Sequence, residues 1–192
     1  MLLIFQGSMA NASPLPQAAI MFTIQSLTTT PSTAIHNGLI DLLRDSVEGG
    51  ASVGFLSPLK RETADAFWQD MLREVGAAQR VLLVATTGSG EVAGSVQLAL
   101  GQKENGRHRA EVQKLLVHSR YRNHGLGRRL MNAIEREAQQ RGITLLVLDT
   151  IAGELAEQLY LKLGYIRVGE VPNYARFPDG RLGATVIFYK QL

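Results

Sequence analysis

Two spacings of apolar residues divide the chain into expected helices and strands. Apolar side chains recur every three or four residues in 35–47, 62–75, 126–138 and 152–163, which is the period of one helix face. Shorter runs rich in branched apolar residues fall at 20–27, 81–85, 92–100, 110–117, 143–148, 165–171 and 184–189, as expected of strands. The pattern predicts one strand, two helices and three strands, followed by a helix, a strand, a helix and two strands.

Turn and capping residues separate these elements. Ser32 can cap the first helix, Gly49-Gly50 ends it, and Gly88-Ser89-Gly90 predicts a hairpin turn. A strand, a crossover helix and a second strand between 110 and 148 imply parallel neighbours with a right-handed connection. We therefore expect an α/β fold, a mixed twisted sheet of about seven strands with helices on both faces.

Length and composition are those of one globular domain. The chain has 192 residues, of which 45% are hydrophobic and 19% are charged. We interpret residues 1–8 as the remnant of a purification tag, 9–19 as an irregular arm and 20–192 as a single domain. No apolar run approaches the ~20 residues that span a bilayer, so we expect no membrane partner. The absence of cysteine excludes disulfides and fits a cytoplasmic location.

Neither the charged residues nor the histidines indicate binding of nucleic acid or of a metal. The net charge is +3, and the basic residues are spread among acids instead of forming a block. The four histidines share no metal-ligand spacing, so we predict no metal.

A glycine-bearing turn at the start of the helix at 126–138 is the main candidate binding site. Its sequence is Arg122-Asn123-His124-Gly125-Leu126-Gly127, followed by Arg128. The first residues of a helix have free N–H groups and lie at the positive end of the helix dipole. Glycines let a phosphate approach the main chain, and arginine adds positive charge. The turn therefore suits a phosphate, although a glycine-containing loop that only starts a helix is the alternative.

The spacing Arg122-x-x-Gly125-x-Gly127 resembles motif A of the GNAT acetyltransferases. A second segment, from Ala156 to Tyr165, resembles motif B of the same family in the expected order. The resemblance implies the GNAT fold, acetyl-CoA as co-substrate and turn amides that hold its pyrophosphate. It also implies that strand backbone pairs with the pantetheine arm and that Tyr160 returns a proton to the departing thiolate. The implied cofactor-binding residues are Leu115, Leu116, Val117, Arg122, Asn123, His124, Gly125, Leu126, Gly127 and Arg128.

Acyl transfer to an amine needs a neutral nucleophile, whereas an alkylammonium with a pKa of about 10 is protonated at neutral pH. Glu111 resembles in its spacing the glutamate that serves as base in some members of the family. Asp149 follows an apolar strand, at the end where α/β sheets place ligands. Either carboxylate is a candidate base; the alternatives are a surface pair of Glu111 with Arg109 and a helix cap at Asp149. For Tyr160 the alternative is packing alone.

A closer likeness is to the tabtoxin-resistance acetyltransferases, through residues 49–55, 110–115, 148–150 and 178–182. It implies a small polar amine, an antibiotic or toxin among the options, held between the loops at 49–58 and 172–182. The family's asparagine before the tyrosine helix is missing, because this segment reads Thr150-Ile151-Ala152-Gly153-Glu154. The expected function is acetyl transfer from acetyl-CoA to that amine by direct attack in a ternary complex, by a monomer or homodimer. The alternatives are an acyl-CoA binding module without catalysis and an enzyme that acetylates protein lysines or N-termini.

Overall fold

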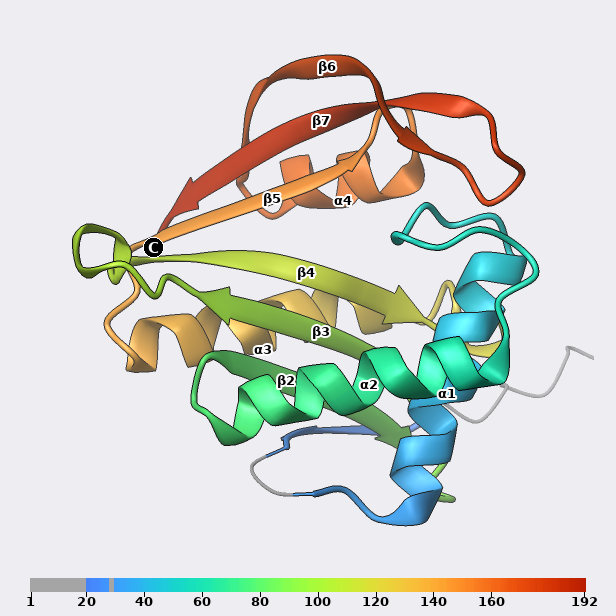
Figure 1. The fold of residues 1–192 in the computed structure, drawn as a ribbon. Coiled ribbons are helices and arrows are strands. Elements are labelled where there is room, and N and C mark those ends of the chain that lie inside the picture. Colours follow the sequence, from blue (N-terminus) through green and yellow to red (C-terminus); the bar gives the residue numbers. More distant parts are fainter. Residues whose placement is uncertain (1–19, 28–29) are drawn as a thin grey trace, which may run out of the picture.

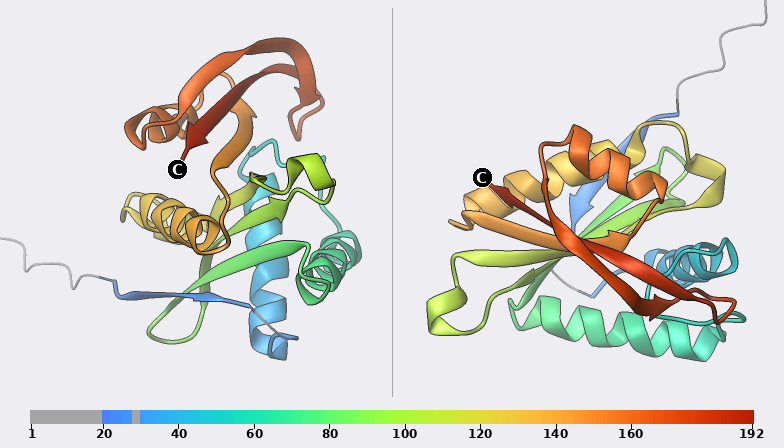
Figure 2. Two further views of the ribbon diagram at one scale, coloured as in Figure 1. Left: turned by 90° about the vertical axis from the view of Figure 1, so that its left-hand side faces the viewer. Right: turned by 90° about the horizontal axis from the view of Figure 1, so that it is seen from above.

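A computed structural model describes residues 20–27 and 30–192, and in these residues seven strands form a mixed sheet with helices on both faces (Figures 1 and 2). The predicted tag remnant and arm, residues 1–8 and 9–19, lie outside the described residues. The strands follow the order β1-β2-β3-β4-β5-β7-β6, and the predicted fold class is confirmed. Their bounds are β1 (Phe22–Ser26), β2 (Arg80–Thr87), β3 (Val92–Leu100), β4 (Arg109–Val117), β5 (Leu145–Ile151), β6 (Ile166–Arg176) and β7 (Leu182–Gln191).

The helices cover the two faces of the sheet unequally. They are α1 (Thr33–Glu48), α2 (Arg61–Gly76), α3 (Leu126–Gln140) and α4 (Leu155–Lys162). Helices α1 and α2 lie in front of β2, β3 and β4 in Figure 1, and α3 and α4 lie behind the sheet. Each face has its own core. Trp68 is fully buried with α1 on the first face, and Tyr160, Tyr165 and Phe188 are buried with α3 on the second.

The ends of α1 follow the sequence prediction. The Ser32 side chain accepts a hydrogen bond from the Ile35 N–H, and Gly49 stands at the C-terminal cap. Since both signals act within one turn of the chain, they can be recognised without knowledge of the tertiary structure.

The region between β5 and α4 corrects two predictions. The strand predicted at 143–148 runs from Leu145 to Ile151, and the helix predicted from residue 152 begins at Leu155. The Ala152 N–H donates to the Ala184 carbonyl at 2.9 Å, which continues the contact between β5 and β7. Gly153 then turns the chain with a φ of +81° before the helix starts. Pairing with a distant strand therefore extends β5 at the expense of the helix.

Strands β4 and β5 are parallel neighbours only at their beginnings. Their paired residues are Arg109 with Leu145, Ala110 with Leu146 and Glu111 with Val147. Beyond these pairs the two strands diverge, as the opening between them in Figure 1 shows. All other neighbouring strands of the described sheet are antiparallel, so the sheet opens between its two parallel neighbours, β4 and β5.

A β-bulge interrupts β4 in the same region. The register with β3 shifts between the pairs of Gln97 and Ser95, and Lys114 has a φ of +50°. An extra residue of this kind re-aims the side chains around it, and bulges are common next to active sites.

Among the described helices, none is both long enough and apolar enough to cross a membrane.

Candidate active site

A cavity of about 880 Å³ lies where β4 and β5 diverge. Its walls come from β4, from the end of β5, from the start of α4 and from two loops that follow α1 and precede β7. The residues predicted for catalysis, Glu111, Asp149 and Tyr160, all line it, and so do Leu115 and Arg122 of the predicted cofactor set. Residues far apart in the sequence thus line one cavity.

The two carboxylates project from neighbouring strands on the same side of the sheet. Paired residues share a face and side chains alternate along a strand. Glu111 pairs with Val147, and Asp149 stands two residues farther along β5. The alternative role of Asp149 as a helix cap is wrong, because Asp149 lies inside β5 and Glu154 occupies the cap position of α4.

The Asp149 carboxyl is biased toward its protonated form. Burial raises the pKa of Asp149 above its ordinary value, and the negative charge of Glu111 raises it further. The positive charge of Lys114 acts in the opposite direction. An acid shifted this way is a better proton acceptor at neutral pH than an ordinary aspartate.

Tyr160 lies in α4 and reaches the cavity from the face of the sheet that packs against α3. The residue is only 6% exposed, and its ring packs against Tyr165 and Phe188 with centroids 5.7 and 6.1 Å away. Burial, and then the negative charge of Asp149, raise the pKa of the Tyr160 phenol above its ordinary value. Tyr160 therefore keeps its proton throughout the neutral range and is able to donate it.

The bulge adds a cavity residue that the sequence did not indicate. Lys114 lines the cavity, and its Nζ lies 5.7 Å from the centre of the Phe67 ring. Burial lowers the pKa of Lys114, although the negative charges of Asp149 and Glu111 oppose this effect. No glycine or proline marks the bulge, so no local signal identifies this lysine.

The predicted phosphate turn has the backbone that such a site requires. Asn123 and Gly125 have φ values of +65° and +71°, and Gly125 occupies the cap position of α3. A side chain at Gly127 would point between α3 and α4, where a Cβ would lie 3.5 Å from Leu159 and 4.0 Å from Val117. The first N–H groups of α3 are thus presented on a turn whose side chains leave the main chain accessible.

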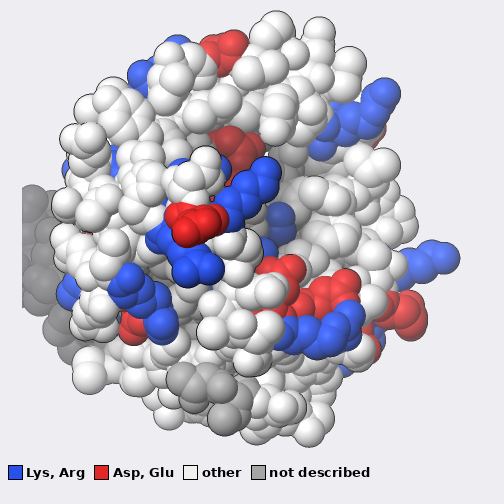
Figure 3. Space-filling model, turned by 60° about the vertical axis from the view of Figure 1, so that its left-hand side comes forward, with Lys and Arg blue, Asp and Glu red and all other residues white. Residues whose placement is uncertain are grey.

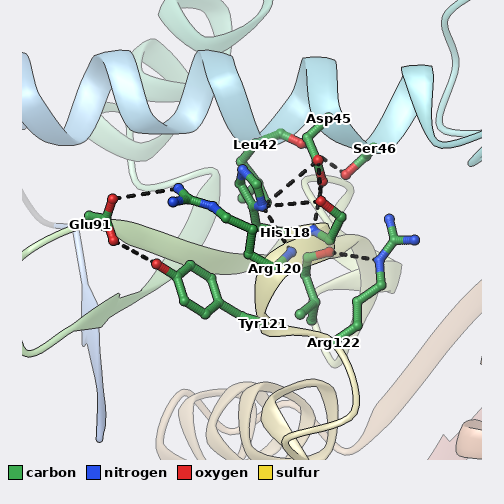
Figure 4. A network of polar contacts seen from close by, with 10 residues as sticks. Leu42, Asp45, Ser46, Glu91, His118, Arg120, Tyr121 and Arg122 are labelled. Carbon is green, nitrogen blue, oxygen red and sulfur yellow. Dashed lines mark hydrogen bonds and ion pairs between the residues drawn. The ribbon is translucent and has the colours of Figure 1, made fainter. Parts of the chain in front are cut away.

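Hydrogen bonds fix this turn to the rest of the protein (Figure 4). Asp45 of α1 accepts bonds from the Ser119 N–H at 2.8 Å and the Ser119 hydroxyl at 2.6 Å. Tyr121 donates to Glu91 at 2.6 Å, and the Arg122 Nε donates to the last carbonyl of β4 at 3.3 Å. Because Asp45 lies one turn before the end of α1, the same helix supports the turn and leads into the loop at 49–56.

The residues at 115–117 contribute main chain more than side chains. Leu116 is buried in the core with α1, and Val117 packs against the core on the opposite face. No residue of β4 beyond Glu111 pairs with β5. The edge of β4 that faces β5 is therefore unpaired with β5 at the divergence, which fits the predicted pantetheine contact.

The structure does not gather every predicted residue into the cavity. Leu126 is buried in the core, while Asn123, His124, Gly125 and Arg128 are exposed on the turn outside the cavity lining.

Within the described residues, no group of three His, Asp or Glu side chains converges as metal ligands would. On the face drawn in Figure 3, basic and acidic side chains lie beside one another instead of forming a patch of one sign.

Two hydrogen bonds join the predicted loop at 49–58 to the β6–β7 hairpin on the acceptor side of the cavity. The Ser52 hydroxyl donates to the carbonyl of Arg176, the last residue of β6, and the Ser57 N–H donates to the Pro178 carbonyl in the following turn, both at 3.1 Å. The second loop, predicted at 172–182, is shorter in the structure, because pairing of β6 with β7 continues to Arg176 and Leu182. The contact between the first loop and the hairpin encloses the cavity on that side.

The sheet is mixed, and its two parallel neighbours β4 and β5 diverge. A glycine turn precedes the next helix, and carboxylates line the opening between the strands. Together these features define an acyltransferase of the GNAT architecture. The sequence matches the family model for the acetyltransferase (GNAT) family over residues 43–165, and the chain belongs to this family. It is an N-acetyltransferase, and the family uses acetyl-CoA.

Comparisons with individual proteins agree with this assignment. An uncharacterized N-acetyltransferase in the hisH-hisA intergenic region of Azospirillum brasilense is 33% identical over 129 residues, which cover 66% of this chain and 74% of the relative. A ribosomal-protein-alanine N-acetyltransferase from Brucella melitensis shares the fold with a TM-score of 0.72 and 23% identity, over 88% of this chain and 99% of that one. A protein from Salmonella typhimurium, solved as an acetyltransferase with its cofactor acetyl-CoA, shares the fold with a TM-score of 0.72 and 19% identity, over 90% of this chain and 94% of that one.

Proposed function

We propose that this enzyme transfers acetyl from acetyl-CoA to the primary amine of a small polar molecule, by direct attack in a ternary complex. The observation that carries the proposal is the cavity of about 880 Å³ that joins Glu111, Asp149 and Tyr160 at the divergence of β4 and β5. A base, an acid and a place for an extended thioester ligand are the parts that such a transfer needs.

The proposed coenzyme site follows the free main chain. Acetyl-CoA supplies an acetyl thioester. The first N–H groups of α3, with Arg122 and Arg128 beside them, would hold its pyrophosphate. The edge of β4 that faces β5, which has no β5 partner beyond Glu111, would bind the pantetheine arm at 115–117 as an added strand.

The proposed proton transfers use the cavity side chains. Asp149, whose pKa is raised by burial and by the charge of Glu111, accepts the proton of the acceptor ammonium directly or through a water. Glu111 adds negative charge that attracts the ammonium. Tyr160 donates its phenolic proton to the departing sulfur, because its raised pKa keeps it protonated before the transfer.

The loop contact favours a small acceptor over a peptide. A peptide substrate needs an open groove, whereas Ser52 bonds across to the end of β6 and Ser57 to the turn between β6 and β7. The segments that resemble tabtoxin-resistance acetyltransferases, at 49–55 and 178–182, lie in these two loops. This position supports an acceptor the size of an amino acid or a small amine-bearing antibiotic.

The test is a panel of small amines and aminated antibiotics, with an N-terminal alanine peptide for comparison, assayed for release of coenzyme A. We expect turnover with a small amine and little with the peptide. The double variant Glu111→Gln, Asp149→Asn should bind acetyl-CoA normally but lose most of this turnover. Efficient acetylation of the peptide, with no small amine accepted, would replace the proposal by a protein acetyltransferase.

A further inference from the structure

Lys114 occupies a special position in the acceptor cavity. The β-bulge, with its shift of register against β3, inserts an extra residue at this point of β4. As a result Gln113 and Lys114, although consecutive, both face the side of α2. Gln113 accepts a bond from Arg80, which also bonds Glu74 of α2, and Lys114 lies over the Phe67 ring of α2. The bulge thus directs a cation into a cavity that otherwise presents carboxylates from the same sheet face.

The ammonium of Lys114 forms no direct ion pair with the described residues. No carboxylate of the described residues lies within 4.0 Å of its Nζ. The Phe67 ring face at 5.7 Å offers a cation–π contact, which is weaker than a charge-assisted hydrogen bond. Water can solvate the ammonium while the cavity is open. Once coenzyme and acceptor displace that water, the ammonium needs a partner.

The carboxylates do not supply this partner when an acceptor is bound. Glu111 and Asp149 then face the acceptor amine, which is their role in the proposed function. The cavity therefore presents these two carboxylates and, apart from them, the ammonium of Lys114. A site with separated charges of both signs matches a ligand that also carries charges of both signs.

The other cations that line the cavity are engaged elsewhere. Arg122 donates to the last carbonyl of β4 beside the phosphate turn. Arg176 is exposed, and its guanidinium donates to the Gly180 carbonyl at 2.9 Å within its own hairpin. Lys114 is the cavity cation in the described residues without such a hydrogen bond.

We propose that Lys114 is an anion-binding residue of the acceptor cavity and that the preferred acceptor carries an anionic group, such as a carboxylate, a few bonds from its amine. This inference rests on the proposed function and narrows its substrate class. Arg122 and Arg176 would not be needed for the discrimination. Lys114 would act in substrate binding and not in the chemical step.

The test compares matched acceptors that differ only in this charge. Glycine, β-alanine and 4-aminobutyrate are paired with their amides, together with larger amino acids and their amides, and kcat/KM is measured for each. The wild-type enzyme should prefer at least one acid over its amide by on the order of 10- to 100-fold, as expected for a hydrogen bond to a charged group. The difference should lie in KM.

Variants assign the preference to Lys114. Lys114→Met keeps the length and apolar stem over Phe67 and should reduce the ratio of acid to amide in kcat/KM toward one. Lys114→Arg should retain the preference, and Lys103→Met, an exposed lysine outside the cavity, should not alter it. Thermal melts of all variants establish that they are folded.

The outcomes separate the two proposals. Turnover of small amines without preference for the acids, or a preference that persists in Lys114→Met, overturns the anion-binding role and leaves the amine acetyltransferase intact. Failure of every small amine, acidic or neutral, overturns the proposed function, and the inference with it.

Discussion

Replacing Tyr160 by phenylalanine isolates one proton in the proposed reaction. The ring of Tyr160 is buried against Tyr165 and Phe188, so Tyr160→Phe keeps this packing and removes only the hydroxyl that faces the cavity. We therefore expect a folded protein that binds acetyl-CoA with unchanged affinity.

The expected loss lies in kcat. General acid catalysis contributes about 10²–10⁴-fold, but a thiol with a pKa of about 8.5 is already a fair leaving group. The loss should therefore fall near 10²-fold, which corresponds to about 2.7 kcal/mol in activation free energy. Since the raised pKa keeps Tyr160 protonated well above neutral pH, its own titration should not limit the wild-type rate in the neutral range.

The assay measures coenzyme A release at saturating acceptor, with acetyl-CoA affinity determined separately. Tyr165→Phe is a matched control, because Tyr165 is also a buried tyrosine of this aromatic cluster but does not line the cavity. A tenfold or smaller change in Tyr160→Phe, equal to that of the control, would refute the acid role and make Tyr160 a packing residue.

Three further variants test the coenzyme turn, the carboxylate pair and the support of the turn. Gly127→Val should reduce the rise in melting temperature that acetyl-CoA causes by binding to the native state, because the branched side chain would crowd Leu159 and Val117 and displace the start of α3. A rise of normal size would contradict a phosphate site at this turn. Asp149→Asn should lose activity yet raise the melting temperature at pH 7, because a carboxyl whose pKa is raised in the folded state lowers stability once the pH exceeds its unfolded pKa of about 3.9. The increase in melting temperature should become smaller as the pH falls toward that value. An equal increase at all pH values would contradict this reasoning. Asp45→Ala removes both bonds to Ser119 and should raise KM for acetyl-CoA roughly 5- to 10-fold with little change in kcat, because only part of the net free energy of the two bonds, about 1 kcal/mol each, reaches the coenzyme through the turn. Asp41→Ala on the same helix should leave KM unchanged.

Features decided within one or two turns of the chain were predictable from the sequence. The helix α1 with its Ser32 cap and Gly49 end is one case, and the turn at Gly125 before α3 is another. The apolar spacing that defines these helices depends only on neighbours along the chain. The parallel step of the sheet also followed, because a strand, a helix and a strand permit few connections.

Features decided by distant strands were not predictable. The end of β5 is set by its pairing with β7 and by the bond of Ala152 to Ala184, which local spacing does not encode. The bulge at Lys114 depends on the register against β3. The bond between Asp45 and Ser119 joins residues 74 positions apart, and neither residue belongs to a recognisable motif. The cavity was therefore predictable in its acids and its tyrosine but not in its lysine.

The short parallel contact between β4 and β5 also has a mechanical consequence. Three residue pairs form the ladder between β4 and β5, so the backbone hydrogen bonding of the sheet is shortest at this seam. A coenzyme whose amides bond to the β5-facing edge of β4 at 115–117 would extend this ladder and stiffen the seam. We expect amide hydrogens along the divergence to exchange quickly in the free enzyme, and proteases to cut it faster than the coenzyme-bound form. In this fold the substrate would complete part of the scaffold that binds it.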